Sequence, residues 1–275
     1  PLFPLTAILQ RLSWAGLPAE QVPFALIPSY ETFHLAKPNP AYMAELLAQL
    51  GWPEGPVLMV GDDPKLDIDA ARQLGLPVFW IAASDAVWPG PGPEPPRGAL
   101  EDLLPWIDRQ PASALLPDFT LPSAMQAVLR STPAALATLL AGRSFAELTF
   151  QPQPGEWSAV EVVCHLRDVD LEVNLMRLDK ALESDNPFIP GQDTDQWALQ
   201  RQYIQQDCLE AQQTFLQARM KLLTVVESMT EADWDRSVRH AIFGPTKLRE
   251  LINIIARHDR LHVRQVLQAL RASRN

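Results

Sequence analysis

The sequence is poor in the residues that mark several common classes of protein. It contains two cysteines, Cys164 and Cys208, among 275 residues. Two are too few for a disulfide scaffold, so we expect a cytoplasmic protein. No apolar run approaches the roughly 20 residues of a membrane-spanning helix. Acidic residues outnumber basic ones by 33 to 23, which argues against nonspecific binding to nucleic acid or to an anionic membrane.

The remaining composition is that of a globular chain with more than one domain. Hydrophobic residues make up 47% and charged residues 20% of the sequence, and the length favours two domains. A proline-rich stretch at 88–96 cannot form a helix or a central strand. A second loose segment follows it. We therefore predict an α/β domain over 1–110, a linker over 111–121 and a helical domain over 122–275.

The first part alternates between helical and strand patterns. Short apolar runs at 56–60 and 77–81 are typical of buried parallel strands. Apolar residues at helical spacing occupy 41–50 and 67–74. Strand, helix and strand joined by short connections predict a parallel α/β layer.

The second part shows helical periodicity throughout. We predict helices at about 122–141, 158–183, 207–229 and 246–272, which suit an antiparallel four-helix bundle. Ser158 and Glu161 form a capping-box pattern at the start of the second helix. An apolar stripe is expected along that helix; it consists of Val162, Leu166, Val169, Val173 and Met176.

Three of the five histidines share a predicted interior. His258 and His262 stand four residues apart on the last helix, so their imidazoles lie one turn apart on one side. His165 lies beside the apolar stripe of the second helix. Three inward imidazoles with an open position suit a divalent ion such as zinc, nickel, iron or manganese. The alternative is a set of core histidines satisfied by hydrogen bonds.

Neighbouring residues are expected to have simpler roles. Glu161 should cap its helix and Asp168 should be solvated, although either could orient an imidazole. Asp259 projects about 100° away from His258 and is expected to be a surface or interhelical charge. His240 is expected in a solvated loop. Three tryptophans could cover the site or belong to the core: Trp157, Trp197 and Trp234.

Short motifs in this part resemble the DinB-like family of metal-binding four-helix proteins over about residues 122–272. The motifs are Gly155-Glu-Trp-Ser158, the segment 161–166 and the segment 258–265. The resemblance implies that His165, His258 and His262 hold the metal. It also implies a metal-dependent thiol transferase that acts on a small molecule, with a low-molecular-weight thiol as a possible cosubstrate. A hydrolase that uses a metal-bound hydroxide is the neighbouring possibility. A homodimer is possible, and a metal-binding or scaffold module without turnover is the alternative.

The first part resembles the C-terminal half of a haloacid-dehalogenase-like phosphohydrolase, over segments 35–40 and 57–75. The resemblance implies that Lys37 stabilises a phosphorylated nucleophile and that Asp62 and Asp67 hold Mg²⁺. The family's nucleophile, an Asp-x-Asp motif, is missing, because residues 1–36 contain no aspartate. We therefore expect no phosphatase activity from this chain alone. We expect either a degenerate half-domain or a fragment of a longer phosphohydrolase-like fusion, and the start at Pro1 favours the fragment.

Overall fold

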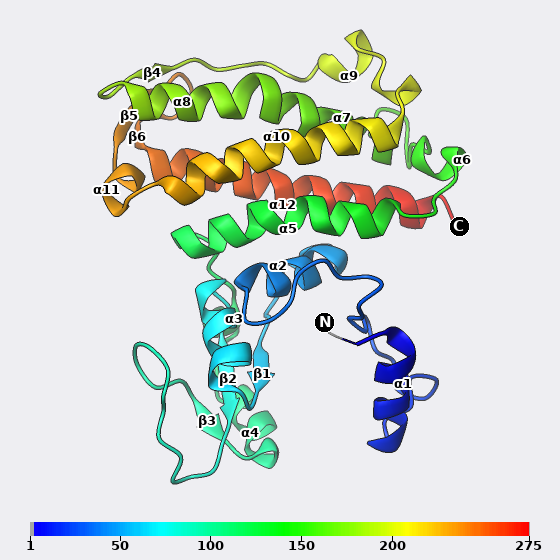
Figure 1. The fold of residues 1–275 in the computed structure, drawn as a ribbon, viewed down its shortest axis with the longest axis vertical. Helices are drawn as coiled ribbons and strands as arrows, with labels where there is room; N and C mark the ends of the chain where they lie inside the picture. Colours follow the sequence, from blue (N-terminus) through cyan, green and yellow to red (C-terminus); the bar gives the residue numbers. More distant parts are fainter. Residues whose placement is uncertain (1–2, 275) are drawn as a thin grey trace. The chain divides into compact units, whose positions relative to one another are not determined.

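The chain forms two compact units, each with a core of its own (Figure 1). This computed structural model describes residues 3–274. The first unit is Pro1–Ala127 and the second is Val128–Asn275. Among the described residues, no helix combines the length and apolar character that crossing a bilayer requires.

The first unit contains the predicted parallel α/β layer. Its sheet has the order β1-β2-β3, with both pairs parallel; Val60 lies opposite Phe79. The strands are β1 (Met59–Gly61), β2 (Val78–Ile81) and β3 (Arg97–Gly98). The α-helices are α1 (Leu5–Trp14), α2 (Pro40–Gln49), α3 (Ala70–Gln73) and α4 (Leu103–Asp108). A π-helical turn, Pro64–Asp69, precedes α3, and 3-10 turns occupy Leu100–Asp102 and Ala112–Leu115.

Local sequence signals set the ends of these elements. The Asn39 side chain accepts a hydrogen bond from Ala41 N at 2.9 Å and so caps α2. Gly75 has a φ of 84°, and a Cβ there would lie 1.7 Å from the carbonyl oxygen of Asp118. Glycine is therefore required where the chain turns from α3 into β2.

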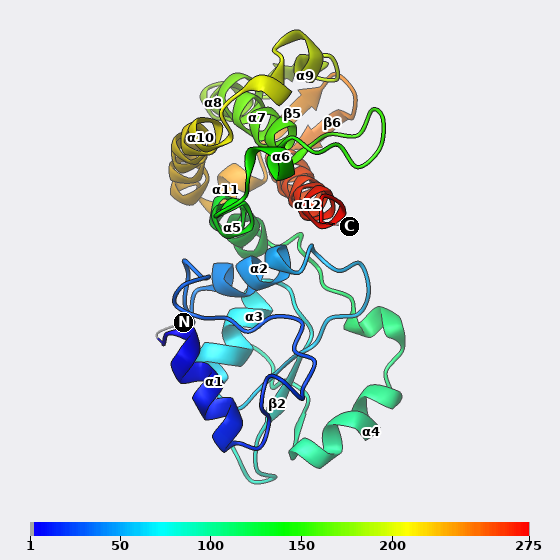
Figure 2. The ribbon, with the colours of Figure 1, turned by 90° about the vertical axis from the view of Figure 1, so that its right-hand side faces the viewer.

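The second unit is a four-helix bundle, as predicted. Four long helical segments surround its core, and Figure 2 shows them nearly end-on. They are α5 (Pro122–Leu140), the continuous run of α7 (Ala159–Val169) and α8 (Leu175–Glu183), α10 (Cys208–Ser228) and α12 (Leu248–Ala272). Short helices lie between them: α6 (Phe145–Leu148), α9 (Trp197–Gln200), the 3-10 turn Tyr203–Gln205 and α11 (Glu231–Trp234).

The unit is not all-helical, which corrects the sequence prediction. A small sheet has the order β4-β5-β6, with β4 parallel to β5 and β5 antiparallel to β6. The strands are β4 (Phe188–Ile189), β5 (Ser237–His240) and β6 (Gly244–Lys247). Strands of two to four residues are too short to give a periodic signal in a sequence.

A π-helical turn, Asp170–Asn174, joins α7 to α8. Such a turn takes one more residue than an α turn, so the residues after it shift around the helix. Val173 is buried as predicted, but Met176, the last member of the expected stripe, is 65% exposed. Leu178 and Ala181 are buried in its place.

A buried ionic cluster of Arg219, Asp170 and Asp259 joins the bundle helices. Arg219 is completely buried and donates from Nε to Asp170 Oδ2 at 2.7 Å and from Nη2 to Asp259 Oδ1 at 2.9 Å. It also donates from Nη1 to the Leu129 carbonyl at 3.1 Å. Asp259 is thus an interhelical charge and not a surface one. Burial raises the pKa of Asp259, whereas the guanidinium opposes that shift.

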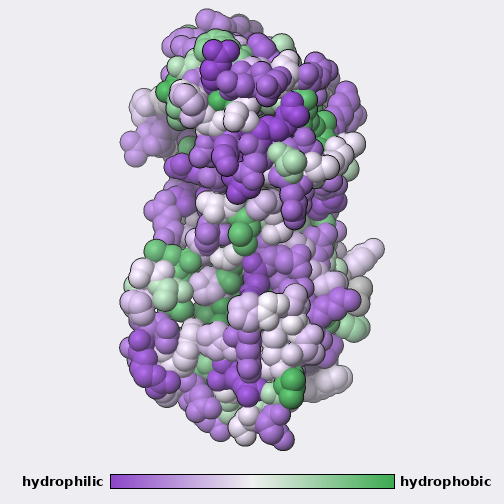
Figure 3. Space-filling view, turned by 90° about the vertical axis from the view of Figure 1, so that its left-hand side faces the viewer, coloured by the Kyte–Doolittle hydropathy of each residue, from purple (hydrophilic) through white to green (hydrophobic). Residues whose placement is uncertain are grey.

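The surface is mostly hydrophilic on the face shown in Figure 3, where hydrophobic residues occur in small groups. Large apolar patches usually mark obligate protein interfaces. This face offers no broad patch of that kind, and the homodimer stays a prediction.

Candidate metal centre

The bundle brings the side chains of His165, His258 and His262 together. His165 lies on α7, and the other two lie one turn apart on α12. The Nε2 atom of His258 is 3.0 Å from Nε2 of His165 and 2.9 Å from Nε2 of His262. The candidate ligand atoms of all three lie within 4.8 Å of one another.

Helix caps fix the positions of these histidines along their helices. Ser158 begins α7 with a capping box, in which its backbone N donates to Glu161 Oε2 at 2.8 Å. Glu161 is therefore a capping residue, as expected. Glu250 accepts from Lys247 N at 3.0 Å and closes the first turn of α12. Both helices therefore begin at defined residues.

A hydrogen bond sets the tautomer of His262. Its Nδ1 lies 2.6 Å from Oε1 of Gln265, and an amide oxygen only accepts. The proton therefore sits on Nδ1, and the Nε2 lone pair faces the other imidazoles.

Three converging Nε2 atoms cannot satisfy one another. A neutral His258 Nε2 either donates its single proton to the His262 lone pair or accepts from His165, and it cannot do both. Nitrogen ligands at 2.0–2.1 Å from one ion lie about 2.9 Å apart at right angles and about 3.4 Å apart in a tetrahedron. The contacts of 2.9 and 3.0 Å fall in this range. The donor set thus fits a single divalent cation.

The imidazoles are held neutral at physiological pH. Burial lowers the pKa of His165 to about 3 and that of His262 to about 4. Burial also keeps the pKa of His258 well below its usual value, and the two neighbouring imidazoles add to the effect. Neutral imidazole is the form that coordinates a metal.

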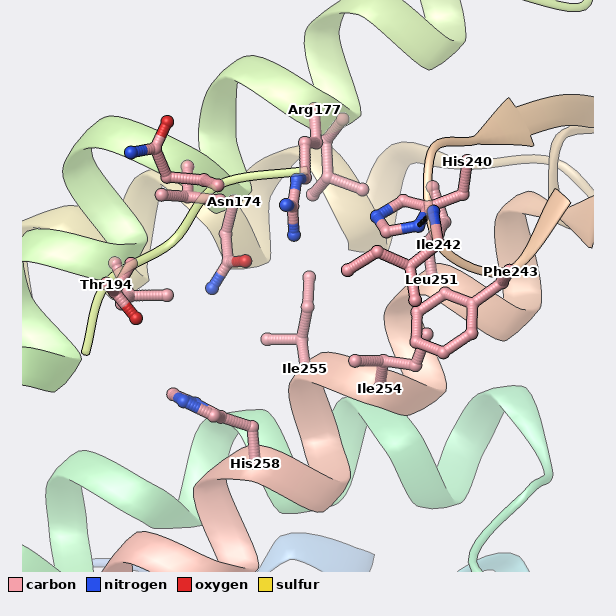
Figure 4. Close-up of a pocket in the computed structure, with 14 residues that line it drawn as sticks. Asn174, Arg177, Thr194, His240, Ile242, Phe243, Leu251, Ile254, Ile255 and His258 are labelled. Carbon is pink, nitrogen blue, oxygen red and sulfur yellow. Dashed lines mark hydrogen bonds between the residues drawn. The ribbon is translucent and has the colours of Figure 1, made fainter. Parts of the chain in front are cut away.

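A pocket of about 200 Å³ adjoins the cluster, with His258 in its wall (Figure 4). α12 supplies Ile254 and Ile255, and the opposite helical segment supplies Asn174 and Arg177. The tip of the β5–β6 hairpin closes one side with Ile242 and Phe243. His258 is therefore the member of the cluster that borders this pocket.

A family model described as the DinB superfamily matches residues 129–266, half of the chain. The chain belongs to the DinB superfamily. The resemblance seen in the sequence is thus confirmed, together with the four-helix bundle. A second model, described as HAD-hydrolase-like, matches residues 34–84, which agrees with the partial α/β segment.

Individual relatives match the DinB part of the chain. YuaE of Bacillus subtilis is 24% identical over 138 residues, which span 46% of this chain and 85% of YuaE. A Geobacillus kaustophilus protein named "Putative metal-dependent hydrolase" is 27% identical over 150 residues, 51% of this chain and 79% of that protein.

Among solved structures, YfiT from Bacillus subtilis is described as a probable metal-dependent hydrolase with an unusual four-helix bundle topology. It superposes with a TM-score of 0.50 at 18% identity, over 56% of this chain and 88% of YfiT. At this identity the similarity supports the fold alone.

Two side chains near the DinB centre differ from expectation. His240 is buried on β5 and lines the pocket, whereas the sequence suggested a solvated loop. Asp168 is buried and not solvated. It accepts from Arg167 Nε at 2.6 Å and from Arg201 Nη1 and Tyr203 OH at 2.7 Å. Asp168 thus ties the segment after α9 to α7.

The tryptophans divide between the two expected roles. The Trp157 ring lies 4.8 Å from that of His165 and stacks at 5.9 Å on that of His262, so it covers one side of the cluster. Trp197 and Trp234 are buried, and the Arg201 guanidinium lies 3.8 Å from the Trp197 ring centroid.

Sequence reasoning missed the roles of Gln265, Arg219 and Arg177. Only Gln265 left a signal, since a residue three positions after a helical histidine can reach its ring.

In the first unit, Lys37 and Asp67 form an ion pair at 2.5 Å. Asp67 Oδ2 also accepts from Asp63 N at 3.2 Å, while Asp62 is exposed after β1. Among residues 3–274, the histidine cluster is the one group of three or more side chains that could hold a metal ion. The Mg²⁺ site of the first unit stays a prediction.

Proposed function

We propose that the DinB unit is a metal-dependent enzyme that hydrolyses a small molecule, with His165, His258 and His262 holding one divalent ion. The convergence of three Nε2 atoms, together with a pocket that His258 lines, carries this proposal. The name of the Geobacillus relative supports it.

Each element of the site has a distinct task. A bound zinc, nickel, iron or manganese ion would supply Lewis acidity, which polarises an electrophile and lowers the pKa of a nucleophile. The low imidazole pKa values keep all three donors unprotonated. Trp157 shields one side of the cluster from solvent, and the pocket that His258 lines would hold the substrate.

The pocket favours catalysis over a purely metal-binding or scaffold role, because such roles need no space for a substrate. A low-molecular-weight thiol is an alternative nucleophile to water, since thiols are partly ionised near neutral pH and a cation promotes their ionisation. The same centre would then carry out a thiol transfer.

Metal content of the full chain tests the proposal. We expect about one ion per chain after loading with zinc, nickel or manganese and dialysis, and little in a His258→Ala variant. His240→Ala is the matched control, because it removes a buried histidine of the same unit from outside the cluster. Wild-type protein without metal, or equal metal in His258→Ala, would refute the centre. Loaded wild-type protein is then assayed on ester and amide panels, with and without added thiol.

A further inference from the structure

Arg177 is a half-buried cation that lacks a negative partner. It lines the pocket on α8. Its Nη2 donates to the Pro190 carbonyl at 3.3 Å, and it forms no ion pair with any residue from 3 to 274. Burial lowers the pKa of Arg177, with no carboxylate opposing that effect. Buried charges in proteins are normally paired, so this guanidinium is suited to an anion from outside the chain.

Neighbouring polar groups add hydrogen-bond donors to the same end of the pocket. His240 Nδ1 accepts from Ile242 N at 3.2 Å, which leaves the proton of the neutral ring on Nε2. Figure 4 shows the His240 ring and the Asn174 amide on either side of the Arg177 guanidinium. One N–H of Asn174 donates to Asp170 Oδ1 at 2.8 Å. An oxyanion at this end would find the Arg177 guanidinium and the Nε2–H of His240 as donors.

The space between this polar end and the metal cluster is lined mostly by apolar side chains, with Gln192 and Thr194 as further polar residues of the pocket. Ile255 projects between Arg177 and His258 in Figure 4. The other apolar lining residues are Val169, Val173, Leu178, Ile242, Phe243, Leu251 and Ile254. A volume of about 200 Å³ accommodates a short hydrocarbon body.

We propose that this pocket binds the carboxylate of a small, mostly apolar acid through Arg177 and directs the other end of that molecule toward His258. One guanidinium balances the single charge of a carboxylate, whereas a phosphate monoester carries nearly two charges. The inference rests on the proposed function only for the reaction at the His258 end; the anion site stands on Arg177 itself.

Hexanoate is the probe, titrated calorimetrically into the full chain in metal-free and zinc-loaded forms. Hexanamide has the same size without the charge. We expect hexanamide to bind the wild-type protein at least about tenfold more weakly. Arg177→Met should weaken hexanoate by a similar factor in both forms, and Arg177→Lys by less. The matched control is Arg239→Met, since Arg239 also donates to a carbonyl at 3.3 Å, that of Asn186, but does not line the pocket.

Equal binding of hexanoate and hexanamide would overturn the inference, as would unchanged affinity in Arg177→Met. Tighter binding of hexyl phosphate than of hexanoate would overturn the carboxylate assignment. If Arg177→Met fails to fold, the comparison of the two probes on wild-type protein decides.

These outcomes are separable from those of the metal proposal. Hexanoate binding that requires zinc and ignores Arg177 would refute the anion site and leave the metal centre intact. Hexanoate binding that depends on Arg177, in a protein that takes up no metal, would refute the metal centre and support the anion site.

Discussion

Replacing Arg219 by methionine should strongly destabilise the DinB bundle at neutral pH. The change leaves Asp170 and Asp259 without a cation in a site where all three side chains are almost fully buried. Breaking a buried ion pair on one side costs about 3–5 kcal/mol. This loss of stability is limited because an unpaired carboxylate can take up a proton. Protonating a carboxylate with an ordinary pKa near 3.9 takes about 4 kcal/mol at pH 7 and about 1.5 kcal/mol at pH 5.

The pH dependence of the loss gives the experiment its specificity. Without the guanidinium nothing opposes the effect of burial, so the folded-state pKa of Asp259 rises further above the unfolded value. A group of this kind loses stability as the pH rises toward its folded pKa. The gap between variant and wild type should therefore shrink by at least about 1 kcal/mol between pH 7 and pH 5.

Urea unfolding followed by far-ultraviolet circular dichroism measures this gap at both pH values. Arg130→Met is the matched control, because Arg130 pairs with Glu227 on the surface and should cost at most about 1 kcal/mol. Adding Asp170→Asn and Asp259→Asn to Arg219→Met should restore part of the stability. A loss below about 1 kcal/mol at pH 7, or a loss that does not change with pH, would refute the reasoning.

Three further predictions concern the metal centre and its helices. Metal-free protein should lose stability from pH 7 toward pH 4, because the folded pKa values of about 3 for His165 and 4 for His262 lie below the unfolded value near 6.5; a urea midpoint that does not move would contradict this. Gln265→Leu should weaken metal binding about 10–100-fold in a chelator competition, whereas Gln268→Leu, on the exposed side of α12, should not. Ser158→Ala should cost about 1 kcal/mol, measured as a shift in the thermal midpoint, because it removes the buried hydroxyl that donates to Glu161 Oε2 at 2.7 Å.

The sequence predicted what depends on local periodicity. Helical spacing located all four bundle helices, and the four-residue interval placed His258 and His262 on one side of α12. The convergence of His165 needed the further assumption that apolar stripes face one interior. The family motifs supported that assumption, and the structure gives the distances.

Features set by long-range pairing could not be predicted in this way. From the sequence alone, Arg219 would be placed on the surface. In the fold it is buried because Asp170 and Asp259, on other helices, pair with it. The sequence also suggested that His240 lies in a loop, but it belongs to β5, which pairs with β4 and β6. In both cases the partners are distant in sequence, so no local pattern records the burial.

The π-helical turn at Asp170–Asn174 explains how one helical run serves both the metal cluster and the pocket. In an uninterrupted α-helix the stripe that contains Val169 and Val173 would continue to Met176. The extra residue of the π turn shifts every later position by about 100°, so Met176 points outward and Arg177 takes the pocket-facing place. An unbroken helix would present a thioether where the pocket has a guanidinium. The helical run thus presents apolar residues beside His165 in α7 and the polar Arg177 to the pocket in α8. π turns are frequent at functional sites. The extra residue of the π turn therefore interrupts the helical periodicity of the sequence. It also places Arg177, on which the anion site depends, in the wall of the pocket.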